Sequence, residues 1–457
     1  MPVEGRRLQV TTQTKETFAA HRSRKQMETK LARIEEISRR KPDEVFTSLY
    51  HMLNEEMLLQ CHKELDGNKA AGVDKVTKTS YQESLTENIR GLVARLKRKG
   101  YRPQPVRRTY IPKGDGKSQR PLGIPAYEDK IVQLGVSKIL QAVYEPMFLD
   151  LSYGFRPNRN CHDALKALGR AIEREKTNYI VEADIRGFFD HVDHEWLMKF
   201  IGHRISDPNI KRLIVRFLKA GIMEDGKLKH TDEGTPQGGV ISPILANLYL
   251  HYVLDLWFTK VVVKYCKGHA RMIRYADDFV CTFQNKDDAE RFHTVLIKRL
   301  AKFNLEIAED KTKIFMFGRY AEQCLKDAGK PQTFDFLGFT HYCGKSKDGR
   351  FRVKRKTSRK KYKQKVKGFQ EWVRSIRNNK MNEIIKTVKS KLVGHYRYYG
   401  ITDNSNMIGK YRHKVTMLLF KWLNRRSQRK SFTVEKFQLF LKKHQLPYPK
   451  IYVNMYG

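Results

Sequence analysis

Apolar residues recur along this chain at two different spacings, and each spacing predicts a different kind of element. Between residues 128 and 149 the helical spacing predicts one broad apolar face, formed by Ile131, Val132, Leu134, Ile139, Leu140 and Val143. Similar patterns predict helices within 44–100, where glycines interrupt them, and at His194–Ile205, Pro243–Val261 and Ala289–Phe303. Short runs of β-forming residues predict strands at Val106–Ile111, Arg120–Ile124 and Tyr179–Asp184, and a hairpin over Arg271–Phe283.

The order of these elements favours an α+β fold. Helices come first, a hairpin follows, and then a small sheet packed with helices. Residues 355–430 are again predicted to be helical. The first hairpin has a strong turn signal, because Asp115-Gly116 suits tight hairpin turns. The chain contains neither a Gly-x-Gly-x-x-Gly sequence nor a P-loop, which argues against a doubly wound nucleotide-binding sheet.

The charge of the chain is large and unevenly distributed. The 457 residues include 90 Lys and Arg against 49 Asp and Glu, a formal net charge of +41. Residues 351–457 alone hold 29 Lys and Arg and only 4 Asp and Glu. This excess indicates a polyanionic partner, because phosphates would relieve the repulsion between like charges. A solvated basic surface is the alternative.

Cysteine usage and hydropathy exclude several classes of protein. The six cysteines form no Cys-x-x-Cys pair, so we expect no zinc module and a reducing compartment. No apolar run approaches the roughly 20 residues that a membrane span requires. The N-terminal residues show no apolar signal core.

Three acidic residues are candidates for chemistry. Asp277 and Asp278 interrupt an otherwise strand-like run, and a cation between them would relieve their repulsion. Asp184 ends a predicted strand, where a sheet edge could present it to the same cation. Magnesium suits such hard oxygen ligands, and two ions about 4 Å apart support phosphoryl transfer. The alternatives are a solvated turn for the pair and a turn or helix-capping role for Asp184.

Two further segments have the composition of loops that approach a ligand. In Gly234–Asn247, glycines and proline surround Gln237 and precede a predicted helix. In Tyr110–Pro125, Lys113 and Arg120 lie on the predicted hairpin, which could fold over a triphosphate. Arginine in particular forms two-pronged contacts with phosphate. A simple helix start and a hairpin with solvated charges are the alternatives.

Together these segments resemble the bacterial group II intron-encoded reverse transcriptases, often called maturases. Their motifs occur in the order of that family over roughly 105–340, with one further match in the basic region. The motifs are Arg120–Pro125, Ser152–Asn158, Asp184 with Phe188-Phe189-Asp190, Gly234–Asn247, Tyr275–Asp278, Glu309–Thr312, Phe336–Phe339 and Leu392–Gly400. The family implies a right-hand polymerase fold, in which fingers and a palm with a small antiparallel sheet precede an α-helical thumb or maturase domain.

The resemblance implies a catalytic centre at the acids. Asp184, Asp277 and Asp278 match the family's catalytic metal-binding acids, and Ile185 is a further expected metal ligand. Lys311 matches a lysine that could protonate pyrophosphate as a general acid. An ordinary surface lysine is the alternative for Lys311.

The resemblance also implies nucleotide contacts. Arg120 matches the arginine that contacts the incoming triphosphate, with Lys113 as a further candidate. Gln237 matches a glutamine near the nucleotide sugar and the template base. Phe189 lies where the family places a bulky side chain against the sugar 2′ position, which implies preference for deoxynucleotides. A core aromatic is the alternative, and Phe188 is the better candidate for that core role.

The basic last quarter corresponds to the family's thumb, which grips the template–primer duplex and structured intron RNA. The residues that we expect to bind nucleic acid are Lys354, Arg355, Lys356, Arg359, Lys360, Lys363 and Tyr396. Packing in the thumb core is the alternative for the aromatic residue.

We expect four parts along the chain. They are a basic helical N-terminal extension at 1–60, fingers and palm at 61–345, the helical thumb or maturase domain at 346–430, and a basic segment at 431–457. One interpretation of the last segment is a rudimentary DNA-binding region. Many relatives carry a His-Asn-His endonuclease, but no cysteine follows Cys343 here. We therefore expect this nuclease to be absent, and the primer for DNA synthesis to come from elsewhere.

The function implied is that of an RNA-directed DNA polymerase, which binds group II intron RNA and assists its splicing. The same protein would copy the intron into DNA during target-primed retrotransposition, with deoxynucleoside triphosphates and two Mg²⁺ ions, or Mn²⁺ as a substitute. Its expected partners are intron RNA, target DNA and the template–primer duplex, and no membrane. The expected location is the bacterial cytoplasm near the nucleoid, with an organelle as the alternative.

Three other functions stay open at this point. One is a domesticated reverse transcriptase of this kind that acts in phage defence or DNA repair. Another is a non-catalytic RNA-binding splicing factor, which the intact set of acids argues against. The third is an RNA-templated RNA polymerase, which Phe189 argues against.

Overall fold

A four-stranded antiparallel sheet organises the molecule. It contains β3 (Tyr179–Asp184), β6 (Ala270–Tyr275), β7 (Asp278–Phe283) and β8 (Lys313–Met316), in the spatial order β6-β7-β3-β8. The strand and the hairpin predicted for this region are both confirmed. The computed structural model describes residues 27–112, 119–229, 233–235, 237–324, 331–426 and 432–456 of the chain.

Side chains of this sheet enter two separate hydrophobic cores. Successive side chains of a strand point to opposite faces, so Val181 of β3 lies in the first core and Ile180 in the second. Residues of α11 (Lys286–Ala301) contribute to the first core, and residues of α6 (Cys161–Arg174) contribute to the second. The sheet is therefore covered on both faces, and only its edges and strand ends can present residues to a ligand.

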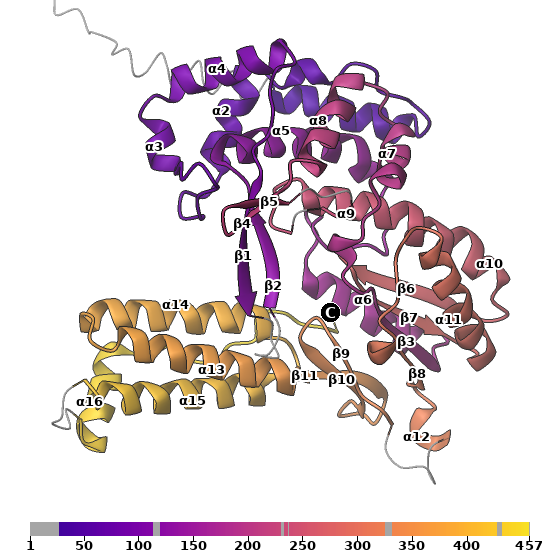
Figure 1. Ribbon diagram of the computed structural model, residues 1–457. Coiled ribbons are helices and arrows are strands. Elements are labelled where there is room, and N and C mark those ends of the chain that lie inside the picture. The colour runs from indigo at the N-terminus through magenta and orange to yellow at the C-terminus, as the bar shows by residue number, and fades with distance from the viewer. Residues whose placement is uncertain are drawn as a thin grey trace, which may run out of the picture.

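Helices of an N-terminal lobe, at the top of Figure 1, build most of the first core. Residues 27–40 are helical. The labelled helices of this lobe and of its junction with the sheet are α2 (Glu55–Glu64), α3 (Lys78–Gln82), α4 (Leu85–Lys97), α5 (Tyr127–Tyr144), α7 (His194–Gly202), α8 (Pro208–Leu218) and α9 (Ser242–Leu250). The apolar face predicted at 128–149 belongs to α5, most of whose residues are buried.

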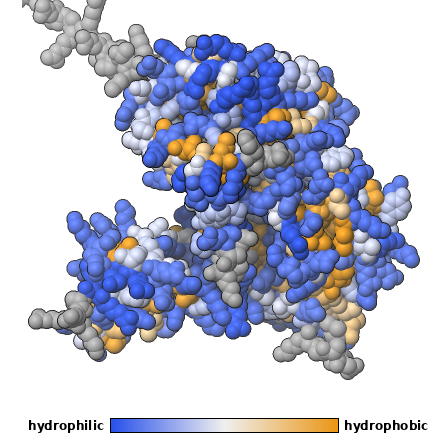
Figure 2. Space-filling model, viewed as in Figure 1, coloured by the Kyte–Doolittle hydropathy of each residue, from blue (hydrophilic) through white to orange (hydrophobic). Residues whose placement is uncertain are grey.

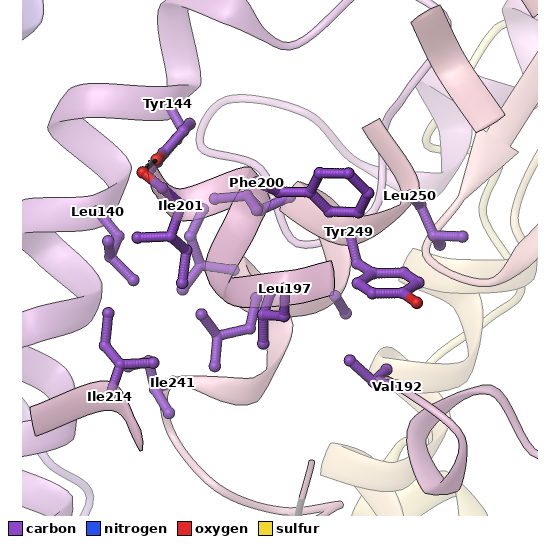
Figure 3. Close-up of a cluster of buried hydrophobic side chains, with 14 of the residues drawn as sticks. Leu140, Tyr144, Val192, Leu197, Phe200, Ile201, Ile214, Ile241, Tyr249 and Leu250 are labelled. Carbon is purple, nitrogen blue, oxygen red and sulfur yellow. Dashed lines mark hydrogen bonds between the residues drawn. The ribbon is translucent and has the colours of Figure 1, made fainter. Parts of the chain in front are cut away.

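Figure 3 shows how this core joins α5, α7 and α9. Leu140 and Tyr144 of α5 lie near Ile201 of α7, and the Tyr144 hydroxyl donates a hydrogen bond to the Ile201 carbonyl at 2.8 Å. Phe200 of α7 packs edge-on against Tyr249 of α9, with ring centroids 5.4 Å apart. The N-terminal lobe is thus continuous with the helices that cover the central sheet.

A second sheet carries the first predicted hairpin. Its strands are β1 (Val106–Pro112), β2 (Gln119–Ile124), β4 (Ile222–Glu224) and β5 (Lys227–Lys229), in the order β2-β1-β4-β5. The pairing of β1 with β2 confirms the hairpin, whose predicted turn lies outside the described residues. The β4–β5 hairpin was not predicted, although Asp225-Gly226 between its strands is a turn signal.

The long helix predicted at Pro243–Val261 is irregular in its second half. α9 ends at Leu250, and π-helical turns follow at His251–Asp255 and Phe258–Val262, before the short α10 (Val263–Tyr265). Such turns are rare and frequently occur at functional sites. Shorter helical segments elsewhere are the 3₁₀ turns Tyr50–Met52, Glu145–Met147, Phe188–Asp190 and Glu309–Lys311, and α12 (Ala321–Cys324).

The basic last quarter forms a small sheet followed by a helical bundle. The sheet contains β9 (Phe334–Phe336), β10 (Phe339–Lys345) and β11 (Phe351–Thr357), and the helices are α13 (Arg359–Ile376), α14 (Met381–Tyr399), α15 (Ser405–Leu423) and α16 (Val434–His444). The prediction of helix from residue 355 was therefore wrong for 355–357, which extend β11. Figure 1 shows α13, α14 and α15 side by side.

The whole arrangement confirms the α+β fold with fingers, palm and thumb. The N-terminal lobe with the β1–β2 hairpin forms the fingers, the central sheet forms the palm, and α13–α15 form the thumb. Figure 2 shows this face hollowed between the N-terminal lobe and the thumb, with largely hydrophilic surface on both sides. Among the described residues, no helix combines the length and the apolar character that crossing a bilayer demands.

Candidate active site

The structure brings the three predicted acids together at one end of the palm sheet. Asp184 is the last residue of β3 and lies directly opposite Asp278, the first residue of β7. Directly opposed residues of antiparallel strands have Cα atoms about 4.5–5.5 Å apart. Asp277 precedes Asp278 in the tight turn between β6 and β7. All three acids are partly exposed, so a ligand can reach them.

The turn that carries Asp277 depends on a close backbone approach. Ala276 has a φ angle of +58°, in the left-handed region that residues with a side chain rarely adopt. The loop at Gly154 packs directly against this turn, since a Cβ at Gly154 would lie only 2.3 Å from the Ala276 nitrogen. Backbone hydrogen bonds fix this loop to β6, from Tyr153 N to the Arg274 carbonyl at 2.9 Å and from Arg274 N to the Leu151 carbonyl at 2.8 Å.

A fully buried ion pair also fixes the turn. Arg274 and Asp255 both have side chains with no exposed area, and the guanidinium contacts the carboxylate twice, at 2.7 and 2.5 Å. Arg274 Nη1 also donates to the Ala276 carbonyl at 2.9 Å and to Asn247 Oδ1 at 3.1 Å. Sequence reasoning missed this role of Arg274 and Asp255. The available signals were a charged residue within an apolar strand and an acid within an apolar helix.

The acids are electrostatically crowded. Burial, together with the neighbouring Asp277, Asp184 and Glu182 carboxylates, raises the pKa of Asp278 to about 7. Burial and Asp184 also raise the pKa of Asp277, although Arg120 and Arg274 oppose that shift. Oxygen donors whose ionisation is this unfavourable fit a hard divalent cation, which would supply the missing positive charge.

Lys311 forms an ion pair with one of these carboxylates. Its ammonium group donates a hydrogen bond to Asp184 Oδ2, and this contact raises the pKa of Lys311. Within the described ranges, no three His, Cys, Asp or Glu side chains already stand close enough to form a ready metal-ligand set. The donor chemistry and charge of the acids therefore fit a cation, and a cation bound at Asp184 Oδ2 would replace the contact with Lys311.

Ile185, the other expected metal ligand, directly follows Asp184. The residue is 3% exposed and lies in an isolated bridge with Ile307. The two hydrogen bonds of that bridge run from Arg186 N to the Glu306 carbonyl and from Ala308 N to the Asp184 carbonyl, each 2.8 Å. The Ile185 carbonyl takes part in neither of these bonds.

Among the predicted nucleotide contacts, Arg120 interacts with one of these acids, and Gln237 lies on a loop that is bound to the same strand as Arg120. Arg120 on β2 is exposed, and its charge lowers the pKa of Asp277, which places it within electrostatic reach of the turn. The carbonyl of Gln237 accepts a hydrogen bond from Gly123 N of the same strand at 2.6 Å. The loop with Gln237 is thereby fixed to the hairpin. Lys113 lies outside the described residues.

The two neighbouring phenylalanines have different environments. Phe188 is 2% exposed and packs against Tyr249 in the first core, as expected for it. Phe189 is half-buried, with its ring edge-on to Phe188 at 5.3 Å. The Phe189 carbonyl accepts a hydrogen bond from Thr235 N at 2.7 Å, which fixes it beside the loop with Gln237. Phe189 therefore lies directly beside the loop that carries Gln237.

The basic residues proposed for nucleic-acid binding divide into two groups. Lys356, Arg359, Lys360 and Lys363 are exposed on β11 and α13, and Lys354 is half-buried. Arg355 and Tyr396 do not lie on the expected surface, because their exposed fractions are 0% and 1%. Tyr396 packs in the thumb core, and its hydroxyl donates to the Pro447 carbonyl at 3.2 Å. For these two residues the expectation of a surface contact is corrected.

Two family models match the chain, and together they cover the palm and the thumb. The model described as "Reverse transcriptase (RNA-dependent DNA polymerase)" matches residues 111–341, and the model described as "Group II intron, maturase-specific domain" matches residues 359–440. The chain therefore belongs to the reverse transcriptase family, and its likeness to the group II intron-encoded members is confirmed.

Three individual proteins illustrate the similarity. The chain is 42% identical over 236 residues to the group II intron-encoded protein LtrA of Lactococcus lactis subsp. cremoris, a match that covers 51% of this chain and 39% of LtrA. It is 36% identical over 249 residues to protein YkfC of Escherichia coli, covering 47% of this chain and 63% of YkfC. The matched part thus spans about two fifths of LtrA. A solved structure of telomerase from Candida albicans is similar with a TM-score of 0.43 and 11% identity, over 82% of this chain and 68% of that one.

Proposed function

We propose that this protein is an RNA-directed DNA polymerase that binds group II intron RNA, assists its splicing and copies it into DNA. The observation that carries the proposal is the direct opposition of Asp184 and Asp278 across β3 and β7, with Asp277 in the adjoining turn. The pKa of about 7 at Asp278 supports a centre that works with a divalent cation, for which we propose Mg²⁺.

Each residue of the centre has a proposed task. Asp184, Asp277, Asp278 and the Ile185 carbonyl would hold the metal, which when bound would activate the primer 3′-hydroxyl and stabilise charge on the α-phosphate. Arg120, with Lys113, would orient the triphosphate. Lys311 would protonate the leaving pyrophosphate as a general acid once its contact with Asp184, which raises its pKa, is released.

Two neighbouring residues would select and align the nucleotide. Gln237 lies on the loop that is fixed to β2, near the proposed place of the sugar and template base. The half-buried ring of Phe189 would exclude a 2′-hydroxyl. This arrangement favours deoxynucleotides, which distinguishes the proposal from an RNA-templated RNA polymerase.

The nucleic acid would lie in the hollow between fingers and thumb. Exposed Lys356, Arg359, Lys360 and Lys363 line β11 and α13, and the maturase-specific match covers this helix. In splicing, the protein would supply affinity and RNA folding, and the RNA itself would be the catalyst. Target DNA as a further partner, and the four-part division at 1–60, 61–345, 346–430 and 431–457, belong to the same proposal.

A primer-extension assay tests the proposal. The purified chain should extend a DNA primer on an RNA template with deoxynucleotides and Mg²⁺, and chelation of the metal should stop the reaction. Phe189→Val should raise ribonucleotide incorporation and leave extension with deoxynucleotides largely intact, because only the barrier to the 2′-hydroxyl is removed. If the wild type extends no primer, a non-catalytic splicing factor becomes the better account. If it prefers ribonucleotides, the proposed role of Phe189 is wrong.

A further inference from the structure

A small cavity of about 70 Å³ lies where α6, β11 and the last described residues meet. Five of its nine lining residues are cationic, and one, Glu173, is acidic. The cationic residues are Lys166, Arg170, Arg174, Arg352 and Arg355. A concave site with this composition fits an anion, and neither the acids of the active site nor the exposed face of α13 contributes to it.

Arg355 is the buried member of this cluster. Its side chain is 0% exposed, its Nη1 and Nη2 atoms donate to the backbone carbonyls of Val353 and Leu165, each at 3.1 Å, and its guanidinium also contacts the Tyr456 side chain. Its Nε atom is buried and has no hydrogen-bond partner in the described part of the chain. Gly169 makes room for this group, since a Cβ there would lie 2.1 Å from Arg355 Nη2. The charges of Glu173 and Asp403 offset part of the cost of burying this guanidinium, and an anion in the cavity would offset more of it.

The nearby acids are already engaged by other groups. Glu173 Oε1 accepts a hydrogen bond from Val353 N at 2.8 Å. Asp403 accepts one from the Tyr456 hydroxyl, and Arg352 stacks over the Tyr456 ring at 4.1 Å. Both contacts fix the walls of the cavity, and the five cationic residues still outnumber these two acids.

We propose that this cavity binds a phosphate group. A tetrahedral anion with several acceptor oxygens matches converging guanidinium groups, which bind phosphate through paired hydrogen bonds. Such a ligand would join the palm helix α6 to β11, which leads directly into the thumb helix α13. The phosphate could belong to a nucleic-acid backbone, a case that rests on the proposed function, or it could be free inorganic phosphate.

The cavity is distinct from the catalytic centre. α6 begins at Cys161, whose thiol, together with burial, raises the pKa of Tyr275 next to the acidic turn. At 1.5 Å per residue, Arg170 and Arg174 lie about 14 and 20 Å further along that helix. A phosphate here would therefore be a second anchor and would not be part of nucleotidyl transfer.

The test is a thermal melt of the full chain with millimolar inorganic phosphate, compared with chloride at the same ionic strength. Binding to the folded state should raise the melting temperature by about 2–4 °C. Arg170→Ala with Arg174→Ala, both at exposed positions, should lose this rise. Arg170→Lys with Arg174→Lys should keep part of it. Lys298→Ala with Lys302→Ala removes two exposed charges elsewhere and should leave the full rise in melting temperature. An equal rise in all variants, or no rise in the wild type, would overturn the proposal.

The source of the phosphate is decided by competition. Bound inorganic phosphate is followed by its ³¹P signal while a short oligouridylate without terminal phosphate is added. Displacement identifies a backbone phosphodiester as the ligand, and retention identifies free phosphate. The same titration on Asp277→Asn with Asp278→Asn should be unchanged, so a failure of the polymerase proposal would leave this result intact.

Discussion

Arg274 is the residue on which the shape of the acidic turn most depends. It lies on β6 with no exposed area, contacts both carboxylate oxygens of Asp255, and donates to the Ala276 carbonyl. A buried carboxylate that loses its only charged contact is strongly destabilising. The stability of the fold and the geometry of the site are therefore coupled at this position.

Arg274→Ala should lower the free energy of unfolding by about 3–5 kcal/mol, because Asp255 would be left buried without a cation. Arg271→Ala is the matched control on the same strand. Its ion pair with Glu175 is half exposed, so its loss should cost at most about 1 kcal/mol. Urea denaturation measures the free energy of unfolding of both variants. Equal losses would show that the buried ion pair stabilises the fold no more than the exposed one.

Asp129 makes the stability of the fingers dependent on pH. It is 2% exposed and accepts hydrogen bonds from the Tyr101 hydroxyl and from Gln104 N, yet burial raises its pKa to about 7. Between pH 4 and 7 the unfolded chain has lost this proton and the folded chain retains it. Rising pH therefore removes stability in this window, by up to about 4 kcal/mol.

Asp129→Asn cannot ionise and should lack this contribution. The difference in unfolding free energy between the variant and the wild type should shift in favour of the variant from pH 5 to pH 8. Comparing the two proteins cancels the contributions of other titrating groups. A difference that does not change with pH would show that Asp129 is ionised throughout.

The sequence indicated that the three acids share one site, as they do in the structure, but it misjudged part of the basic surface. Asp184 and the 277–278 pair were recognisable because acids at a strand end and in a turn stand out against β-forming neighbours. Arg355 was misplaced because a run of Lys and Arg was taken as one exposed face. In a strand, alternate side chains point in opposite directions, so Lys354 and Lys356 face outward while Arg355 is buried.

At the scale of elements, local patterns predicted single strands and helices better than their partners. β3 was predicted with its observed bounds, and the β1–β2 and β6–β7 hairpins were also expected. The small sheets that join β1 to β4 and β9 to β11 were not predicted. Their pairing depends on contacts between distant segments, which local periodicity does not report.

The β6–β7 turn should be sensitive to its support at Gly154. Gly154→Ala would place a Cβ 2.3 Å from the Ala276 nitrogen, so the turn must move and primer extension should fall at least about tenfold. Gly91→Ala is the control, because a Cβ on that helix meets nothing within 4 Å. It should stabilise the protein by about 0.5–1 kcal/mol and leave activity unchanged. Equal primer extension by the Gly154→Ala and Gly91→Ala proteins would show that the turn tolerates displacement.

Helix α13 should carry part of the electrostatic affinity for RNA. Lys360→Gln with Lys363→Gln should lower the slope of log affinity against log salt concentration by about 1–2, since each lost phosphate contact removes roughly 0.7–0.9. Lys298→Gln with Lys302→Gln, at the C-terminal end of α11, removes the same charge and should leave the slope unchanged. Filter binding over a range of salt concentrations measures the slopes of both double variants. Equal slopes would exclude this face of α13 as an RNA-binding surface.

At the scale of the whole molecule, two cores meet at the palm sheet. The first core unites the palm with the fingers, and the second unites it with α6 and the thumb. Side chains of β3 and β7 contribute to both, so the strand ends that carry Asp184 and Asp278 are fixed by packing from two directions. This arrangement explains how residues from distant parts of the chain come to share one site. From the sequence, that convergence was indicated only by the resemblance to a family.

The most direct test of the central claim measures DNA synthesis and RNA binding on the same protein preparations. Asp184→Asn, and Asp277→Asn with Asp278→Asn, should each reduce primer extension on an RNA template by at least about 10²–10³-fold, because charge stabilisation at the transferred phosphate is lost. Their affinity for intron RNA should stay within about twofold of the wild type, because phosphate contacts elsewhere provide it. Asp287→Asn, an exposed acid on α11, should change neither quantity. Extension that survives either substitution would contradict the account.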